Sequence, residues 1–245
     1  MIVTSFGEKG FEQYGSRFIE TFLKYWPEDE TLVIYYEAEL KINSPRVECR
    51  NLFDVYGMAE FLDNINESHE IYKGLRTIKG QKFYDYKFDA FKFARKVFSI
   101  ADAALNHEGI VTWIDADVYT HSPVPENFCK DLLNGCYVSH LYRDWSYSEC
   151  GFMSFDTTRV ENVGFMNIYR NYYITGAFRY LGEWHDCYVF DTTRELTGID
   201  SVDLAAGIKD DHPFVKSVLG KYMDHCKGNR KKEGFSPELF NAKQG

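Results

Sequence analysis

Uninterrupted apolar runs that alternate with amphipathic helices constrain the fold of this chain most strongly. Residues 1–5, "MIVTS", begin with such a run, and residues 11–26 then place aromatic side chains at intervals of three or four, which predicts a helix. The next run, "TLVIYYE" at residues 31–37, is typical of a strand in a parallel sheet that helices cover on both faces. The order strand, helix, strand therefore predicts a right-handed crossover unit and an α/β fold.

The alternation continues over the rest of the chain. We predict helices over residues 86–105, 159–173 and 184–196, and strands over residues 109–115, 136–142 and 150–156. Residues 40–80 have a weaker pattern and are predicted to be peripheral, with a short helix at residues 55–65. No linker rich in Pro, Gly or Ser divides the 245 residues, so we predict a single Rossmann-like domain with a mostly parallel central sheet flanked by helices.

The overall charge disfavours some classes of partner. The chain has 28 basic and 37 acidic residues, a formal net charge of −9, which argues against broad binding to nucleic acid or to an anionic membrane surface. No apolar run of about 18 residues is present, and the start lacks the basic end and apolar core of a signal peptide. We therefore expect a cytoplasmic protein without a transmembrane segment, whose six cysteines are free thiols.

One predicted strand ends in two carboxylates. In "VTWIDADVYTHSP", residues 111–123, the apolar run stops at Asp115, and Asp117 follows after a small residue. Two negative charges so close repel unless water screens them or a cation lies between them. Paired oxygen ligands suit Mn²⁺ or Mg²⁺, and the carboxyl end of a strand in an α/β sheet is a usual ligand site. The alternative is an ordinary turn or helix cap, where Asp is also common.

With a long helix before it and a place near the middle of an α/β chain, this segment resembles the nucleotide-sugar glycosyltransferases of the GT-A fold. In that family an Asp-x-Asp motif closes a central strand and binds a divalent metal together with the diphosphate of the donor. The resemblance implies that Asp117 ligates the metal directly and that Asp115 contacts the metal, a metal-bound water or the ribose. Residues 1–120 would form the nucleotide-binding half, and residues 121–245 would hold the donor sugar, the acceptor and a C-terminal metal ligand.

The same resemblance assigns residues to the nucleotide. The first strand–helix–strand unit would hold the base and ribose, with Thr4 and Ser5 at the end of the first strand and Glu37 at the end of the second. The helix that precedes the acidic pair would lie beside the donor. Its basic residues would meet either a phosphate or solvent, with Lys96 predicted to contact the substrate: Lys92, Arg95 and Lys96.

A segment near the C-terminus resembles the remaining part of the metal site. "DHCKGNRK", residues 224–231, is similar to the His–x–x–Gly or His–x–Lys–Gly segment of metal-dependent members. This implies His225 as the third protein ligand, and Lys227 and Gly228 as contacts of the diphosphate, which a cation and a glycine backbone suit. The alternative is a surface histidine in a basic tail. The chain departs from the pattern His–x–x–Gly–x–x–Lys–Pro–Trp of some families, which leaves the donor open.

"GEWHDCYVF", residues 182–190, supplies the candidate catalytic acid. By resemblance, Asp186 would act as base on the acceptor if the reaction inverts configuration, or would lie near the sugar if configuration is retained; Glu183 is a second choice. The alternative for Asp186 is a helix N-cap. "SECGFMSF", residues 148–155, resembles the strand behind the donor sugar, so three of its residues would line the pocket: Glu149, Cys150 and Gly151.

The resemblance thus implies a metal-dependent glycosyltransferase that uses Mn²⁺ or Mg²⁺ and a nucleoside-diphosphate sugar, with a UDP-sugar favoured. The acceptor stays open between a glycan, a lipid-linked sugar, a protein and a modified nucleic-acid base. One alternative is a nucleotidyltransferase acting on sugar phosphates, which would need a denser Gly-rich basic loop than "SFGEKGFEQYG", residues 5–15. Another is a nucleotide-sugar-binding protein without catalysis, and the intact Asp115, Asp117 and His225 count against it.

Overall fold

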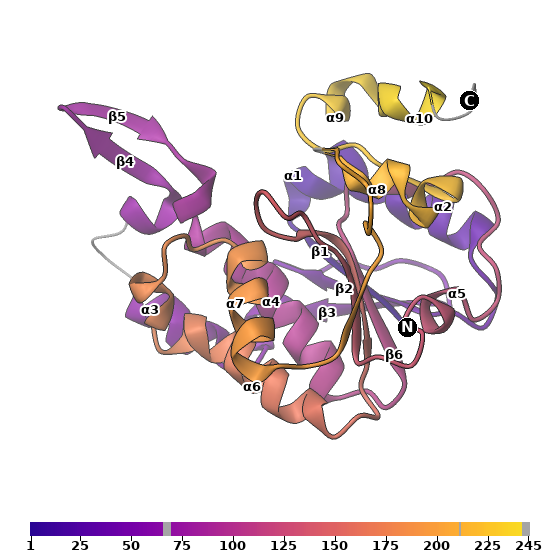
Figure 1. The fold of residues 1–245 in the computed structure, drawn as a ribbon, viewed down its shortest axis with the longest axis horizontal. Coiled ribbons are helices and arrows are strands. Elements are labelled where there is room, and N and C mark those ends of the chain that lie inside the picture. Colours follow the sequence, from indigo (N-terminus) through magenta and orange to yellow (C-terminus); the bar gives the residue numbers. More distant parts are fainter. Residues whose placement is uncertain (66–69, 211, 242–245) are drawn as a thin grey trace.

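A computed structural model describes residues 1–65, 70–210 and 212–241. At its centre lies a seven-stranded sheet with helices on both faces (Figure 1). From one edge to the other, the strands are β10 (Ser201–Asp203), β8 (Val138–Leu141), β9 (Glu149–Asp156), β6 (Ile110–Ile114), β1 (Ile2–Phe6), β2 (Leu32–Tyr36) and β3 (Val47–Asn51). The α-helices are α1 (Glu8–Gly10), α2 (Ser16–Tyr25), α3 (Met58–Asn64), α4 (Ala90–Leu105), α5 (Phe128–Asp131), α6 (Glu161–Ile174), α7 (Asp186–Thr197), α8 (Pro213–Lys216), α9 (Arg230–Glu233) and α10 (Pro237–Asn241).

The sheet is mostly parallel, as predicted. β1 runs parallel to β2 and β6, β2 to β3, and β10 to β8. β9 is antiparallel to both of its neighbours, β6 and β8. This reversal places the start of β9 beside the end of β6, where Ile114 pairs with Phe152. The residues that open β9 therefore lie at the same edge of the sheet as the residues that follow β6.

The uninterrupted apolar run of β2 is explained by burial on both faces. Val33 and Tyr35 pack into one hydrophobic cluster together with residues of α4, α6 and α7. Leu32, Ile34 and Tyr36 pack into a second cluster with residues of α2, α5 and α8. Because successive residues of a strand point to opposite faces, both faces of β2 need apolar side chains.

The predicted helix over residues 86–105 begins later than expected. Residues 86–88 form a 3-10 turn instead, and α4 begins at Ala90. Two aspartates set these starts: the Asp85 carboxylate accepts from the Lys87 N–H, and the Asp89 carboxylate accepts from the Lys92 N–H. Such caps satisfy backbone donors that have no partner inside the helix.

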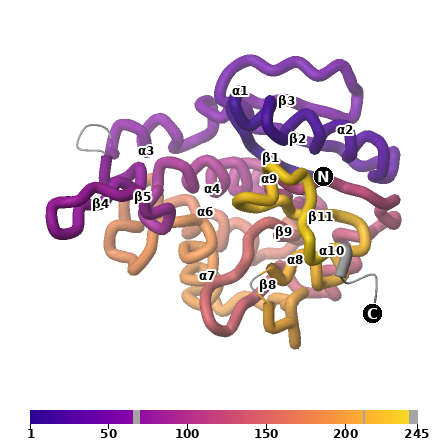
Figure 2. Tube along the Cα trace, turned by 90° about the horizontal axis from the view of Figure 1, so that it is seen from above, coloured from indigo at the N-terminus to yellow at the C-terminus, as the bar shows by residue number. Residues whose placement is uncertain are grey.

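Residues 40–80 contain more structure than their sequence pattern predicts. The short helix is confirmed as α3, but the segment also supplies the edge strand β3, whose residues are partly exposed and include charged side chains. A hairpin of β4 (Leu75–Ile78) and β5 (Gln81–Tyr84) extends away from the body of the molecule (Figures 1 and 2). Within the described ranges, no helix is both long enough and apolar enough to cross a membrane.

The C-terminal segment folds back to the carboxyl edge of the sheet. β11 (Met223–His225) pairs antiparallel with β7 (Val118–Thr120), so that His225 lies opposite Val118. Arg17 on α2 donates a hydrogen bond of 2.6 Å to the carbonyl oxygen of Gly234. The segment that contains α9 therefore lies beside the first helices of the chain (Figure 2).

Candidate active site

A cleft of about 1040 Å³ opens at the carboxyl edge of the central sheet. Its walls come from the ends of β1 and β2, from α4, from the turn after β6, from the starts of β9 and α7, and from the C-terminal segment. Every residue predicted above to bind substrate or metal lines this cleft, apart from Thr4. These residues are Ser5, Glu37, Lys96, Asp115, Asp117, Glu149, Gly151, Asp186, His225, Lys227 and Gly228.

Thr4 lies apart from the cleft. Its side chain is fully buried in β1, whereas the next residue, Ser5, is half-buried and lines the cleft. Consecutive residues of a strand point to opposite faces, so the backbone of β1 delivers one of these two hydroxyls to the cleft and turns the other into the core.

Three side chains predicted to bind a metal converge in the cleft. The Nε2 atom of His225 lies 3.2 Å from Oδ1 of Asp117 and 3.6 Å from Oδ2 of Asp115. One ligand atom from each of the three residues lies within 4.8 Å of the other two. Two carboxylates and an imidazole at this spacing fit a divalent cation such as Mn²⁺ or Mg²⁺, which takes oxygen ligands and accepts imidazole.

The backbone explains how these residues meet from distant parts of the chain. The Asp115 N–H donates to the carbonyl oxygen of Gly151 at 3.0 Å, which ties the acidic turn to β9. The Cys226 N–H donates to the carbonyl oxygen of Asp117 at 3.0 Å, and this bond extends the β7–β11 ribbon to the position of His225.

Cations balance the acids of this cluster. Lys231 lies 2.9 Å from Oδ2 of Asp117. Burial alone would raise the pKa of Asp117, but the His225 and Lys231 charges outweigh it and hold that pKa well below its usual range. Burial likewise opposes protonation of His225, yet Asp117 and Glu149 raise the pKa of this imidazole from 6.5 to about 10. In this state the imidazolium and Lys231 supply the positive charge that keeps the acids together.

Glu149 orients the histidine. Its Oε1 lies 2.8 Å from Nδ1 of His225, and its Oε2 accepts from Lys227 at 2.7 Å. A carboxylate accepts hydrogen bonds, so Nδ1 carries the donated hydrogen, and the lone pair of the neutral ring is then on Nε2, the atom that faces Asp115 and Asp117. Glu149 was predicted to line the donor-sugar pocket; it also holds the candidate metal ligand in place.

Gly151 leaves the space that the His225 ring occupies. A Cβ atom at position 151 would lie 2.6 Å from both Cε1 and Nδ1 of His225. That distance is below any van der Waals contact, so a side chain here would displace the ring. The space that the missing side chain of Gly151 leaves is therefore filled by the His225 ring.

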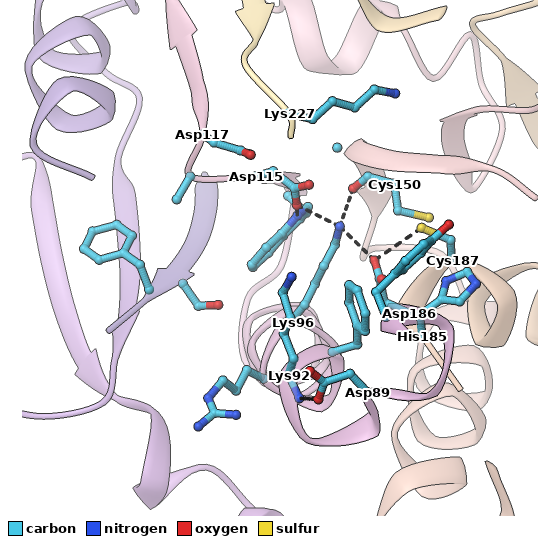
Figure 3. Close-up of a pocket in the computed structure, with 18 of the residues that line it drawn as sticks. Asp89, Lys92, Lys96, Asp115, Asp117, Cys150, His185, Asp186, Cys187 and Lys227 are labelled. Atoms are coloured by element: carbon cyan, nitrogen blue, oxygen red, sulfur yellow. Dashed lines mark hydrogen bonds and ion pairs between the residues drawn. The ribbon is translucent and has the colours of Figure 1, made fainter. Parts of the chain in front are cut away.

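Lys96 and Asp186 form a buried ion pair at the other end of the cleft. Lys96 Nζ lies 2.9 Å from Oδ2 of Asp186, 2.8 Å from Oδ1 of Asp115 and 2.5 Å from the carbonyl oxygen of Cys150 (Figure 3). Trp113 Nε1 donates to the same Asp115 oxygen at 2.7 Å. From the sequence, Lys96 was predicted to meet a phosphate or solvent, and these protein partners were not predicted. Enclosed by them, the Lys96 side chain is only 10% exposed.

Asp186 is the first residue of α7, and the N-cap of that helix is His185. The alternative of an N-cap role for Asp186 is therefore wrong. Burial favours its neutral form, but the charges of Lys96 and His185 lower its pKa, so Asp186 is a carboxylate. Its Oδ1 atom is buried and has no hydrogen-bond partner among the described residues. Buried carboxylate oxygens without a partner are rare in folded proteins.

The side of the cleft formed by the ends of β1 and β2 also contains a carboxylate that a cation holds in place. Glu37, at the end of β2, accepts from Arg95 Nε at 2.7 Å and from Nη2 at 3.3 Å. Arg95 thus contacts an acid of the cleft, and Lys92, one turn earlier on α4, lines the same cleft.

Several cleft residues were not assigned from the sequence. They are Tyr14, Arg143, Tyr147, Cys187 and Lys231. Lys231 has a partial signal in the sequence, because "KGNRKK" at residues 227–232 is a local basic run in an acidic chain. No sequence motif marks the other four as cleft residues, because the packing of loops and helix ends brings them to the cleft.

Comparison with known proteins finds solved structures that resemble this fold. No family model matches the chain, and no curated protein matches it. Among solved structures, the bifunctional glycosyltransferase WbbM is similar to this chain, with a TM-score of 0.54 and 12% identity. The match covers 100% of this chain and 51% of the WbbM chain. Mouse xyloside xylosyltransferase 1 has a TM-score of 0.48 and 10% identity. That match covers 93% of this chain and 97% of the xylosyltransferase chain. The chain therefore shares its fold with a solved glycosyltransferase and spans about half of that protein's length.

Proposed function

We propose that this protein transfers a sugar from a nucleoside-diphosphate sugar to an acceptor, with Mn²⁺ or Mg²⁺ held by Asp115, Asp117 and His225. One observation carries the proposal: these three side chains bring their ligand atoms within 4.8 Å of one another in a cleft of a fold shared with a glycosyltransferase. Carboxyl ends of strands in an open α/β sheet are the places where such ligands bind.

The bound ion would supply Lewis-acid stabilisation for the departing diphosphate. The chain's own contribution is orientation and charge. Glu149 holds the His225 ring with Nε2 directed at the acids. Lys231 neutralises Asp117 in this structure. With an ion held by Asp117, this ammonium group would bind the diphosphate together with Lys227 and the backbone of Gly228.

The nucleotide would lie against the ends of β1 and β2. Ser5 offers a hydroxyl there, and Glu37 offers a carboxylate suited to the two ribose hydroxyls. The Arg95 guanidinium fixes this carboxylate through two hydrogen bonds. A UDP-sugar is the favoured donor on the resemblance alone.

Asp186 would accept a hydrogen bond from the donor sugar. Its Oδ2 is occupied by Lys96, while its buried Oδ1 has no hydrogen-bond partner among the described residues. A carboxylate with a lowered pKa is a weak base, so this pairing favours a positioning role over proton abstraction from the acceptor. A positioning role for Asp186 corresponds to a reaction that retains the configuration of the sugar.

Calorimetry and product analysis test the proposal. Titration of UDP, GDP and other nucleoside diphosphates with and without Mn²⁺ should reveal one nucleotide that binds only with the ion. Its sugar conjugates should then release nucleoside diphosphate when incubated with the protein. Absence of metal-dependent nucleotide binding would contradict the glycosyltransferase assignment, and release of pyrophosphate from a nucleoside triphosphate and a sugar phosphate would support the nucleotidyltransferase instead.

A further inference from the structure

Two cysteines lie beside Asp186, and the proposed reaction uses neither of them. Cys150 is near the start of β9, and Cys187 is the second residue of α7. Their sulfur atoms and a carboxylate oxygen of Asp186 lie within 4.8 Å of one another. Both residues line the cleft, and both side chains are directed to the same corner of it (Figure 3).

The two thiols have different surroundings. Cys187 is partly exposed, lies at the N-terminal end of a helix and comes two residues after His185. The hydrogen bond from Cys150 and the His185 imidazole lower the pKa of Cys187 to about 7 against the opposing effects of burial and Asp186. Cys150 is 1% exposed, and burial raises its pKa, so it stays a thiol. A reachable thiolate beside a second, protonated cysteine is the arrangement of a redox-sensitive pair.

We propose that Cys150 and Cys187 form a dithiol site in which a two-electron oxidant such as hydrogen peroxide makes a reversible disulfide. The Cys187 thiolate attacks one peroxide oxygen, the O–O bond breaks, and the leaving hydroxide takes a proton to become water. The sulfenic acid that results on Cys187 is attacked by the Cys150 sulfur, which loses its proton. The S–S bond forms, the S–O bond breaks, and a second water leaves. Two thiols are oxidised and one peroxide is reduced to two waters.

The new bond would disturb the buried ion pair. A disulfide needs its sulfur atoms about 2.0 Å apart, so the two sulfur atoms must approach each other. A shift of the start of α7 toward the start of β9 would bring them together. Lys96 binds both elements, through the Asp186 carboxylate on α7 and the carbonyl oxygen of Cys150 on β9. Cys187 also contacts Oδ2 of Asp186 at 3.6 Å. This consequence rests on the proposed function: oxidation slows sugar transfer by displacing Asp186.

Peptide mapping tests the disulfide without any assay of turnover. The full chain is treated with hydrogen peroxide, remaining thiols are alkylated after denaturation, and the digest is analysed by mass spectrometry. We expect a cross-linked peptide that joins positions 150 and 187 and disappears on treatment with dithiothreitol. Cys150→Ser should instead leave a sulfenic acid on Cys187 that dimedone traps. Cys136→Ser, which alters a partly exposed thiol outside the cleft, should leave the cross-link unchanged.

Recovery of both cysteines as alkylated thiols, or cross-links that join other cysteines, would overturn the dithiol site. Thermal unfolding of each reduced variant checks that it folds, and Ala variants replace any Ser variant that does not. Where the protein releases nucleoside diphosphate, oxidation should reduce the rate by about a hundredfold, the loss that a displacement of about 1 Å causes. Dithiothreitol should restore the rate, and Cys187→Ser should resist peroxide relative to its own untreated rate. A disulfide with undiminished release refutes the displacement of Asp186 alone.

Discussion

The two ends of the cleft neutralise their acids in different ways. At the end of the cleft that holds the candidate metal ligands, Asp117 and Glu149 pair with Lys231 and Lys227, whose side chains are 39% and 29% exposed. At the end near α7, Asp186 pairs with Lys96, which also contacts Asp115, and the side chains of Asp186 and Lys96 are 2% and 10% exposed. An exposed cation on the C-terminal segment can leave its acid when a metal arrives, whereas a buried pair cannot separate without leaving an uncompensated charge. The first end is therefore suited to ion exchange and the second to fixed geometry.

Removal of the acid at the exchangeable end should have the largest effect. Asp117→Ala deletes the proposed direct ligand, so we expect the affinity for Mn²⁺ and the metal-dependent release of nucleoside diphosphate to fall by more than about a hundredfold, the upper loss seen when supporting residues are removed. Calorimetry with Mn²⁺ and a release assay measure both. Asp131→Ala on α5, an exposed acid outside the cleft, is the matched control. Full metal-dependent turnover in Asp117→Ala would show that the ligand assignment is wrong.

Replacement of Lys96 should lower the free energy of unfolding more than replacement of Lys231 does. Lys96→Met leaves the buried Asp186 carboxylate without its cation and should cost about 3–5 kcal/mol of unfolding free energy. Lys231→Met removes a partly exposed ion pair and should change that free energy by about 1 kcal/mol or less. Urea denaturation of both variants without added metal provides the comparison. Equal losses would mean that the two ends do not differ in the way their charges are held.

The space at Gly151 offers a steric test of the exchangeable end. Gly151→Ala places a Cβ atom 2.6 Å from the His225 ring, so the ring must turn away from Asp117. We expect Mn²⁺ affinity to fall by about tenfold to a hundredfold, as for other residues that orient a ligand. Gly164→Ala on α6 is the control, because a Cβ atom there has no neighbour within 4 Å. Unchanged Mn²⁺ affinity in Gly151→Ala would argue against His225 as a ligand.

Proton release should accompany metal binding. The pKa of His225 is raised from 6.5 to about 10 in the folded protein, so at neutral pH the ion displaces one proton from this ring. Mn²⁺ affinity should then rise about tenfold per pH unit below that pKa. The raised pKa also stabilises the metal-free fold fully below pH 6.5, and this contribution is lost as the pH rises through about 10. Calorimetry in buffers of different ionisation enthalpy counts the proton, and His225→Gln should abolish its release.

The strands that frame the cleft could be predicted because their apolar runs fill both faces of the sheet, as β2 and β6 do. β3 could not, since an edge strand with Glu48 and Arg50 on it has no such run. Asp115, Asp117 and His225 were predicted through short motifs, and the structure brings them together. Their assignment as metal ligands stays a prediction.

The partners of Lys96 were beyond the sequence. Its contacts with Asp186 and with the backbone of Cys150 depend on the antiparallel course of β9 and on the place where α7 begins. The same two elements bring Cys150 and Cys187 together. No local pattern marks either juxtaposition, because it arises from tertiary packing between segments far apart in the chain.

The β7–β11 ribbon also sets the order in which the parts of the cleft assemble. During synthesis the turn that carries Asp115 and Asp117 emerges well before β11, and domains begin to fold from the N-terminal side. Until β11 docks on β7, His225 is absent from the cleft and so is the Lys231 charge that follows it. A ribosome-bound or prematurely terminated chain would therefore possess the acids without the imidazole, and its cleft would be incomplete until the last part of the fold closes.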